Sequence, residues 1–334
     1  MKIILCTGDS HTCGTGVERV KPASLLETED ISYHIFGTGT SRNDDFSMPN
    51  YVNLLRRYIT EHTDSRASVA DGASLAAESG YPVCHGAVLL EGPLSMKHSS
   101  DLLSVCFVEH GEEAEVGIYL DGVLYKKETL YTPSPRFNDW SFRSVPVFAA
   151  GSKEIRIVPL RGRVYISHIQ QASGEYAVIN SGVGSTSSRR YLEECFPYCV
   201  EAFRPDLIIA EAHTINDWLR MESPEEHRAS LEALVRNMQT VCKKIVLMTV
   251  SPILGDQKSP TNGIEYNDFV AASRKVGAQD GVIVVDANRA IERALNAAGE
   301  NDRPSFYANN WHVNEKGHRM YADCLIRTLE EHIL

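Results

Sequence analysis

The sequence predicts an α/β protein, a three-layer α/β/α domain built on a parallel sheet and interrupted by an all-β sandwich. After Gly174, short apolar runs alternate with segments of helical periodicity, a pattern that requires a parallel sheet covered by helices on both faces. Between about Gly86 and Gln171, strand-like runs follow one another without a helix, as in an antiparallel sandwich. The apolar run over residues 2–6 has no other sheet to join, so we expect it to pair with the strands after Gly174.

The domain boundaries follow from the same patterns. Residues 64–82 are small and polar, which is typical of a boundary, and Gly174 marks the return to alternating strands and helices. We therefore assign residues 1–80 and 174–334 to a discontinuous α/β domain, and residues 85–172 to the inserted sandwich.

The first half of the chain contains mostly predicted strands. Residues 2–6 are apolar and β-branched and are followed by Gly8, as expected of a buried strand. Residues 51–59 have apolar side chains at helical spacing. Asp121-Gly122 predicts the tight turn of a hairpin. The sandwich strands are predicted over residues 103–108, 114–120, 155–158 and 164–169.

The second half alternates between the two kinds of element. Buried strands are predicted over residues 176–180, 207–210, 245–250 and 282–285. Helices are predicted over residues 191–203, 224–243, 262–276, 288–298 and 314–334. The second of these helices has Ser223 as its cap and Pro224 at its first position, where a missing N–H costs nothing.

Composition excludes several classes of function. The net charge is −11 and no run of Lys or Arg offers a face for phosphates, which disfavours nucleic acids and anionic membranes as partners. The first apolar run is too short for a signal peptide, and no run is long enough to span a membrane, so we expect a cytoplasmic protein. The eight cysteines form no CxxC pair, so we expect buried thiols and no metal site.

Polar residues follow four of the predicted elements at one edge of the sheet. In a parallel α/β sheet, ligands bind beyond the carboxyl ends of the strands. These four segments supply a hydroxyl, Gly-rich backbone, a side-chain amide and an imidazole, which is the set that acyl transfer requires. They are Thr7–Thr12, Asn180–Ser187, His213–Asp217 and Asn309–Asn314.

This combination resembles the SGNH/GDSL hydrolase superfamily over residues 1–20 and 175–334. Its four blocks appear in order, as Gly8-Asp9-Ser10, the Gly-rich turn after Asn180, Asn216-Asp217 and Trp311-His312. The resemblance implies a serine carboxylic-ester hydrolase that needs no metal or organic cofactor. It implies that Ser10 attacks the ester carbonyl and that His312 is the base. It also implies an oxyanion hole formed by the N–H of Ser10, an N–H of the Gly184-Ser185 turn and the amide of Asn216.

Three positions depart from the family pattern. Asn309 stands three residues before the histidine, where family members place an Asp. Its side chain can orient the imidazole but cannot supply a charge. The alternative is a Ser–His dyad whose imidazole is oriented by a carbonyl. The usual oxyanion glycine falls on Ser185, with Gly184 before it. The glycine two residues before Asn216 is Thr214, which narrows the expected pocket.

Several residues have a structural interpretation beside the functional one. Asn216-Asp217 could cap the turn that follows, although we favour the oxyanion role. His11 and His213 flank the predicted site, and a structural role is at least as well supported as a substrate contact. We expect His318 to pack or be solvated in the last helix, and Asp286 to cap the next helix rather than replace the missing acid.

The added sandwich indicates the substrate class by analogy. Family members with a jelly-roll module often deacylate carbohydrates, so we expect removal of a short acyl group, such as acetyl, from a small-molecule or glycan ester. The sandwich aromatics could help to hold a sugar; they are Tyr119, Tyr125, Tyr131, Phe137, Trp140 and Phe142. The alternatives are an acyltransferase that uses the same site and a carbohydrate-binding protein whose site has decayed. The sequence leaves the oligomeric state and the natural substrate open.

Overall fold

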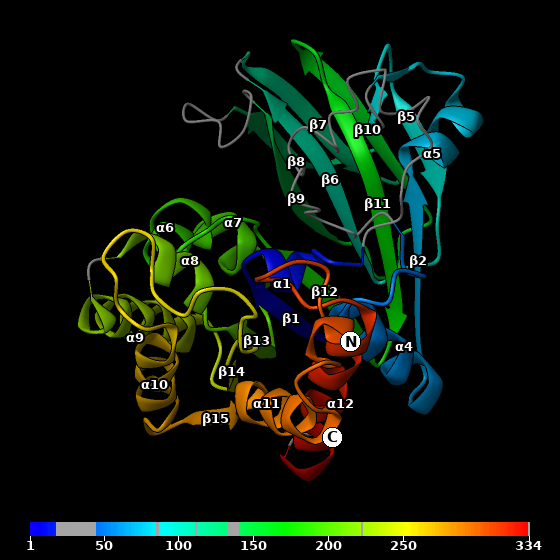
Figure 1. Ribbon diagram of the computed structural model, residues 1–334. Coiled ribbons are helices and arrows are strands. Elements are labelled where there is room, and N and C mark those ends of the chain that lie inside the picture. Colours follow the sequence, from blue (N-terminus) through cyan, green and yellow to red (C-terminus); the bar gives the residue numbers. More distant parts are fainter. Residues whose placement is uncertain (18–44, 85–86, 111, 132–139, 222, 333–334) are drawn as a thin grey trace.

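The computed structural model describes residues 1–17, 45–84, 87–110, 112–131, 140–221 and 223–332. A parallel sheet with its helices forms one part of the molecule, and two antiparallel sheets form the other (Figure 1). No helix in these ranges is long and apolar enough to cross a membrane.

The parallel sheet has five strands in the order β12-β1-β13-β14-β15. Strand β1 pairs in parallel with β12 on one side and β13 on the other, which confirms that the first strand joins strands from the second half of the chain. The bounds are β1 (Lys2–Gly8), β12 (Tyr176–Gly182), β13 (Leu207–Glu211), β14 (Ile245–Met248) and β15 (Val282–Val285).

Helices cover both faces of this sheet. Successive side chains of a strand point to opposite faces, and in β1 Ile3 and Leu5 join one buried apolar cluster while Ile4 and Cys6 join another. The first cluster lies under α7 (Phe196–Cys199), α8 (Thr214–Arg220), α9 (Pro224–Val241) and α10 (Tyr266–Gly277). The second lies under α4 (Tyr51–His62), α11 (Ala287–Ala298) and α12 (Glu315–His332).

The predicted helix over residues 191–203 is broken into short turns. After α6 (Ser188–Arg190), a π-helical turn spans Tyr191–Cys195 and is followed by α7 and a 3₁₀ turn over Glu201–Phe203. Pro197 lacks the N–H that a regular helix needs at this point, which accounts for the wide turn before it.

The two antiparallel sheets share one apolar core. One has the order β5-β10-β7-β8, and the other has the order β3-β4-β11-β6-β9 with β2 also paired to β11. Val116 and Ile157 from the first sheet and Val105 and Ile169 from the second belong to the same buried cluster. The bounds are β2 (Ser65–Asp71), β3 (Val83–Cys84), β4 (Ala87–Leu89), β5 (Leu94–Lys97), β6 (Leu102–His110), β7 (Ala114–Leu120), β8 (Val123–Leu130), β9 (Trp140–Phe148), β10 (Glu154–Arg161) and β11 (Tyr165–Gly174).

Residues 65–79 lie with the antiparallel sheets, whereas the sequence analysis placed residues 1–80 in the α/β domain. Strand β2 pairs along its whole length with β11, and Leu75 of α5 (Gly72–Ser79) is buried in the shared core. Residues 65–79 contain few large apolar side chains, so the sequence pattern does not predict that this stretch forms a strand of the antiparallel sheets.

The predicted hairpin turn is confirmed. Asp121 and Gly122 both have positive φ, of 46° and 82°, between β7 and β8. Two residues in this conformation match the right-handed twist of the strands that they connect.

Candidate active site

The nucleophile block lies where β1 ends. Asp9 caps the short helix α1 (Ser10–Cys13) by accepting from the N–H of His11 at 3.1 Å, and Ser10 is the first helical residue. Gly8 has a φ of 154°, and a Cβ there would lie 2.5 Å from Oε2 of Glu211. A glycine is therefore required for β1 to pass this close to β13.

The structure brings Ser10 into contact with His312, which lies 302 residues later in the sequence, and His312 into contact with Asn309. Oγ of Ser10 lies 2.8 Å from Nε2 of His312, and Nδ1 of His312 lies 3.1 Å from Oδ1 of Asn309. Oδ1 of Asn309 also accepts from the backbone N–H groups of Trp311 and His312, each at 2.9 Å.

These contacts determine the tautomer of His312. Two backbone N–H groups face the Asn309 side chain, so the atom that meets them is its oxygen. An oxygen can only accept, so Nδ1 of His312 carries the proton and Nε2 is left to accept from the Ser10 hydroxyl. This is the arrangement that a general base needs before the hydroxyl attacks.

The environment keeps the imidazole neutral. Burial lowers the pKa of His312 to about 3, and the charge of His11 acts in the same direction, while Asp9 opposes both. The ring of His11 lies 5.1 Å from that of His312. The base is therefore unprotonated over the whole neutral range.

One predicted oxyanion residue, Asn216, contacts the nucleophile block. Nδ2 of Asn216 donates to Oδ2 of Asp9 at 2.6 Å, which leaves its second hydrogen for a substrate oxygen. Ser185 has a φ of 56°, the left-handed region that favours glycine. This conformation is the one expected if Ser185 occupies the position of the oxyanion glycine in the family pattern. Among the described residues, no hydrogen bond engages the backbone N–H of Ser10 or Ser185.

Two buried carboxyl groups lie beneath the nucleophile. Oε2 of Glu211 accepts from the N–H of Asp9 at 2.7 Å, and its other oxygen accepts from the N–H of His213 at 3.0 Å. Burial and the adjacent Asp9 charge raise the pKa of Glu211 well above its usual range. Burial also acts to raise the pKa of Asp9, but hydrogen bonding and charge from His11 outweigh it and lower that pKa. One proton is therefore held on Glu211, and the charge stays on Asp9.

Asp217 anchors the loop that carries Ser185. Its carboxylate accepts from the N–H and hydroxyl of Ser188 at 2.8 and 2.6 Å, and lies 2.6 Å from Nδ1 of His227. Nε2 of His227 lies 2.8 Å from Oγ of Ser273. This Asp-His-Ser set has the order of a triad, but all three side chains are fully buried, so it is closed to substrate.

The remaining histidines and Asp286 have structural surroundings. His318 packs in the core, with Nε2 3.1 Å from the carbonyl of Thr15. Nδ1 of His213 donates to the carbonyl of Thr186 at 2.8 Å. Asp286 caps α11, which confirms the expectation for it, and it pairs with Arg274 at 3.0 Å.

Sequence reasoning missed three residues of the site, Glu211, His227 and Arg220. Glu211 ends a buried strand at the edge where the ligand is expected, and that position was the signal available. His227 contacts Asp217, and Arg220 donates to the carbonyl of Ser185 and to Oδ1 of Asn216. Both lie on helices, and no sequence pattern shows such contacts between side chains.

Comparison with protein families gives one match. Residues 159–320 match the model of the GDSL-like lipase/acylhydrolase family. The match begins in β10 and ends in α12, so it includes Asn216 and His312 but not Ser10. No curated protein matches the chain.

Solved structures resemble the chain at low identity. Protein YXIM from Bacillus subtilis has a TM-score of 0.46 and 13% identity over 80% of this chain and 88% of its own. LAE5, described as an alpha/beta hydrolase enzyme from the metagenome of Lake Arreo, has a TM-score of 0.46 and 12% identity over 98% and 95%. An acetylxylan esterase from Geobacillus stearothermophilus has a TM-score of 0.39 and 19% identity over 46% and 72%.

Proposed function

We propose that the protein is an ester-bond hydrolase that cleaves carboxylic esters through an acyl-enzyme on Ser10, which is supported by the match of residues 159–320 to the model of the GDSL-like lipase/acylhydrolase family. The observation that carries this proposal is the 2.8 Å contact between Oγ of Ser10 and Nε2 of His312, with Nδ1 held by Asn309. The same contact supports a working site over a decayed one.

The first half of the reaction acylates the enzyme. Oγ of Ser10 attacks the ester carbonyl while its proton passes to Nε2 of His312. The N–H groups of Ser10 and Ser185 and the amide of Asn216 hold the oxyanion, each donor contributing about 3–4 kcal/mol. When the tetrahedral intermediate collapses, the C–O bond breaks and His312 returns its proton to the departing alcohol.

The second half releases the acid. Water attacks the acyl-enzyme while His312 takes one of its protons, and collapse returns that proton to Oγ of Ser10. Asn309 keeps the ring in place through both halves. As a neutral amide it adds no charge to stabilise the imidazolium.

A short acyl group on a carbohydrate is the substrate that we propose. Ser10 is only 4% exposed, and Thr186 and His213 in the neighbouring loops are fully buried, which supports a small acyl group. Trp311 lies next to the base and is 40% exposed, so its ring is free to stack on a sugar.

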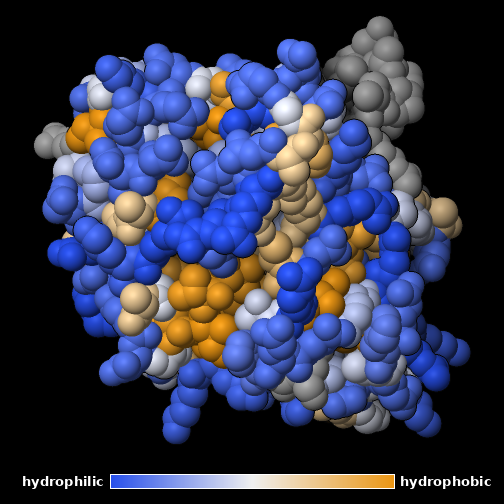
Figure 2. All heavy atoms as spheres, turned by 60° about the horizontal axis from the view of Figure 1, so that its bottom comes forward, coloured by the Kyte–Doolittle hydropathy of each residue, from blue (hydrophilic) through white to orange (hydrophobic). Residues whose placement is uncertain are grey.

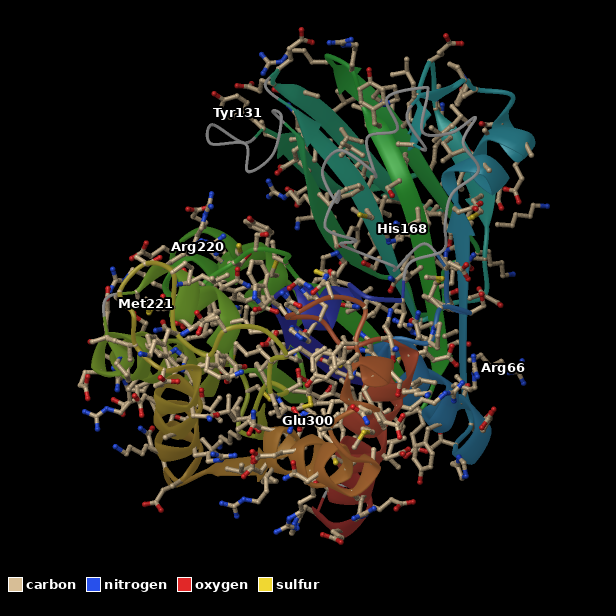
Figure 3. All side chains as sticks on the ribbon, viewed as in Figure 1. Arg66, Tyr131, His168, Arg220, Met221 and Glu300 are labelled. Carbon is tan, nitrogen blue, oxygen red and sulfur yellow. The ribbon has the colours of Figure 1, made fainter. Side chains whose placement is uncertain are left out.

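The antiparallel sheets are proposed as an inserted sandwich domain that helps to hold the carbohydrate. Tyr125 and Tyr131 are exposed on them at 39% and 43%. Figure 3 labels Tyr131 at the end of β8. Phe137 lies outside the described residues, as does the side chain of Trp140.

The test is turnover of para-nitrophenyl acetate and of an acetylated xylo-oligosaccharide. Ser10→Ala and His312→Ala should each reduce kcat by at least about a thousandfold, since each removes a member of the catalytic pair. Ser95→Ala, at an exposed position of β5, is the matched control and should keep full activity. Wild-type rates in the Ser10→Ala variant would contradict the proposal.

A further inference from the structure

Arg220 ties together two parts of the oxyanion site. It ends α8, one helical turn after Asn216, and Figure 3 labels it at the margin of the α/β domain. Its Nη1 donates to the carbonyl of Ser185 at 2.7 Å and to Oδ1 of Asn216 at 2.9 Å. The guanidinium is thereby held in a fixed orientation next to the reacting centre.

The other edge of the guanidinium has no partner among the described residues. The group has five N–H donors, and the two on Nη1 account for both hydrogen bonds. In the described part of the chain, Nε and Nη2 of Arg220 have no hydrogen bond and no carboxylate within ion-pair distance. The residue as a whole is exposed. The Nε–Nη2 edge is the one that binds a carboxylate with two parallel hydrogen bonds.

The charges around Arg220 favour its use in binding an anionic substrate. The chain has a net charge of −11, which repels anionic molecules. Neighbouring arginines on α6 are neutralised, since Arg189 pairs with Glu226 at 2.6 Å and Arg190 with Glu194 at 2.8 Å. Within the described residues, Arg220 therefore offers a local cation whose Nε–Nη2 edge has no partner, and its Nη1 contacts the Asn216 side chain that is proposed to bind the ester carbonyl.

We propose that Arg220 determines specificity by binding a carboxylate on the substrate, so that the enzyme prefers anionic esters over neutral ones of the same shape. This inference rests on the proposed function, because it concerns the same ester site. The competing explanation is that Arg220 only positions Asn216 and Ser185, in which case its loss affects charged and neutral esters alike.

The experiment compares matched pairs of esters that differ by one charge. For a carboxylate on the acyl side, the pair is para-nitrophenyl hydrogen succinate and its methyl ester. For a carboxylate on the alcohol side, the pair is para-acetoxybenzoate and its methyl ester. The charge preference is the ratio of kcat/KM for the anion to kcat/KM for the neutral partner, measured in wild type, Arg220→Gln, Arg220→Lys and Arg190→Gln.

In one of the two pairs, wild type should favour the anion, and Arg220→Gln should reduce that preference roughly 10- to 100-fold, as expected for a charged hydrogen bond. Arg220→Gln also lowers turnover of the neutral ester by a smaller factor, since Asn216 loses a partner. Arg220→Lys should restore part of the preference, and Arg190→Gln, the matched charge removal nearby, should retain most of it.

Two results overturn the inference. One is a wild type that does not favour the anion in either pair, which needs no variant and so does not depend on folding. The other is an Arg220→Gln variant whose two rates fall by the same factor. Either result leaves the proposed function standing provided that turnover still requires Ser10, whereas full activity in Ser10→Ala contradicts the function itself.

Discussion

Asn309 orients His312, the proposed base, without a charge. Its oxygen is fixed by the N–H groups of Trp311 and His312, and the same oxygen also accepts from Nδ1 of the imidazole. A carboxylate at the same place would make the same contacts and also stabilise the imidazolium in the transition state. The arrangement therefore retains the geometry of a triad while giving up part of its electrostatic contribution.

Substitution of Asn309 distinguishes two effects on His312, the orientation of its ring and the stabilisation of its positive charge. Asn309→Asp should hold or raise kcat, because the carboxylate accepts the same hydrogen bonds and adds charge stabilisation. Asn309→Ala should lower kcat about fivefold, since one orienting hydrogen bond of about 1 kcal/mol is lost. Steady-state esterase assays check both, and unchanged rates in both variants would show that Asn309 does not orient the base.

The pH profile should report the lowered pKa of His312. Burial brings this pKa to about 3. Only the neutral imidazole is a base, so kcat/KM should hold as the pH falls through 6.5 and decline only in strongly acidic buffer. Asn309→Asp adds a negative charge near the ring and should move the acid limb to higher pH. An acid limb near pH 6.5 in wild type would contradict this account of the site.

Four residues of the candidate site were predicted from the type of residue and its place in the sequence. Ser10 and Asn216 lie in the segments that follow β1 and β13, and Asn309 and His312 lie in the segment before α12. The structure brings these side chains together. Glu211, His227 and Arg220 were not predicted, because their importance depends on which side chains meet across elements. Burial and pairing of that kind follow from packing and not from sequence spacing.

At the element scale, Asp217 connects α8 to the loop that carries Ser185. Its carboxylate is fully buried and is matched by Ser188 and His227. Removing one member of such a network leaves the other polar groups unsatisfied, which costs more than the hydrogen bond itself.

Asp217→Ala should therefore reduce the free energy of unfolding by about 3 kcal/mol. It should also lower kcat, because the Ser185 loop loses its anchor. Urea unfolding measures the first effect and ester turnover the second. Asp256→Ala is a matched surface control, since Asp256 is exposed and accepts from the backbone N–H of Lys258, and it should change neither quantity. A stable, fully active Asp217→Ala variant would show that the network is dispensable.

Elements with strong patterns were predicted well and those without were not. The helix with Ser223 and Pro224 at its start was expected over residues 224–243 and spans Pro224–Val241, because caps and apolar spacing both mark it. Strand β8 was not predicted as a strand of its own, since Val123, Leu124 and Tyr125 are all exposed and no alternation results. Its position follows from the Asp121-Gly122 turn and from pairing with β7.

On the scale of the whole molecule, the two parts are joined by the chain and by cationic side chains. Strand β11 of the antiparallel sheets leads through Gly174 directly into β12 of the parallel sheet. The guanidinium of Arg204, which follows the 3₁₀ turn after α7, lies 5.5 Å from the ring of Phe148 in β9. The guanidinium of Arg143 lies 5.6 Å from the ring of Tyr198 in α7.

Apolar side chains are exposed at one edge of the parallel sheet, beside β15. Figure 2 shows the face of the molecule that carries α10, β15 and α11, with hydrophobic side chains gathered in its centre. Val284 of β15, the last strand in the sheet order, is 38% exposed. This edge lies at the end of the sheet opposite to β12 and takes no part in the acyl chemistry proposed above.

Buried histidines should make the whole fold sensitive to acid. Burial lowers the pKa of His168 and of His318 to about 3, against about 6.5 in the unfolded chain. Their contribution to stability is present above pH 6.5 and is lost as the pH falls from there toward 3. Between pH 7 and 5, each should remove about 2 kcal/mol from the free energy of unfolding.

Denaturant unfolding at the two pH values checks this expectation. His168→Gln should reduce the loss between pH 7 and 5 by about 2 kcal/mol, because one buried imidazole no longer titrates. His62→Gln, at an exposed position of α4, is the matched control and should leave the pH dependence unchanged. A pH dependence that is the same in wild type and His168→Gln would contradict the assignment of this effect to His168.

The central claim is that Ser10 is the acylated nucleophile, and covalent labelling tests it most directly. A fluorophosphonate should react once per chain with the wild-type protein, and peptide mapping by mass spectrometry should find the adduct on Ser10. His312→Ala should react far more slowly, because the hydroxyl has lost its base. An adduct on any other serine, or equal labelling of Ser10→Ala, would contradict the account.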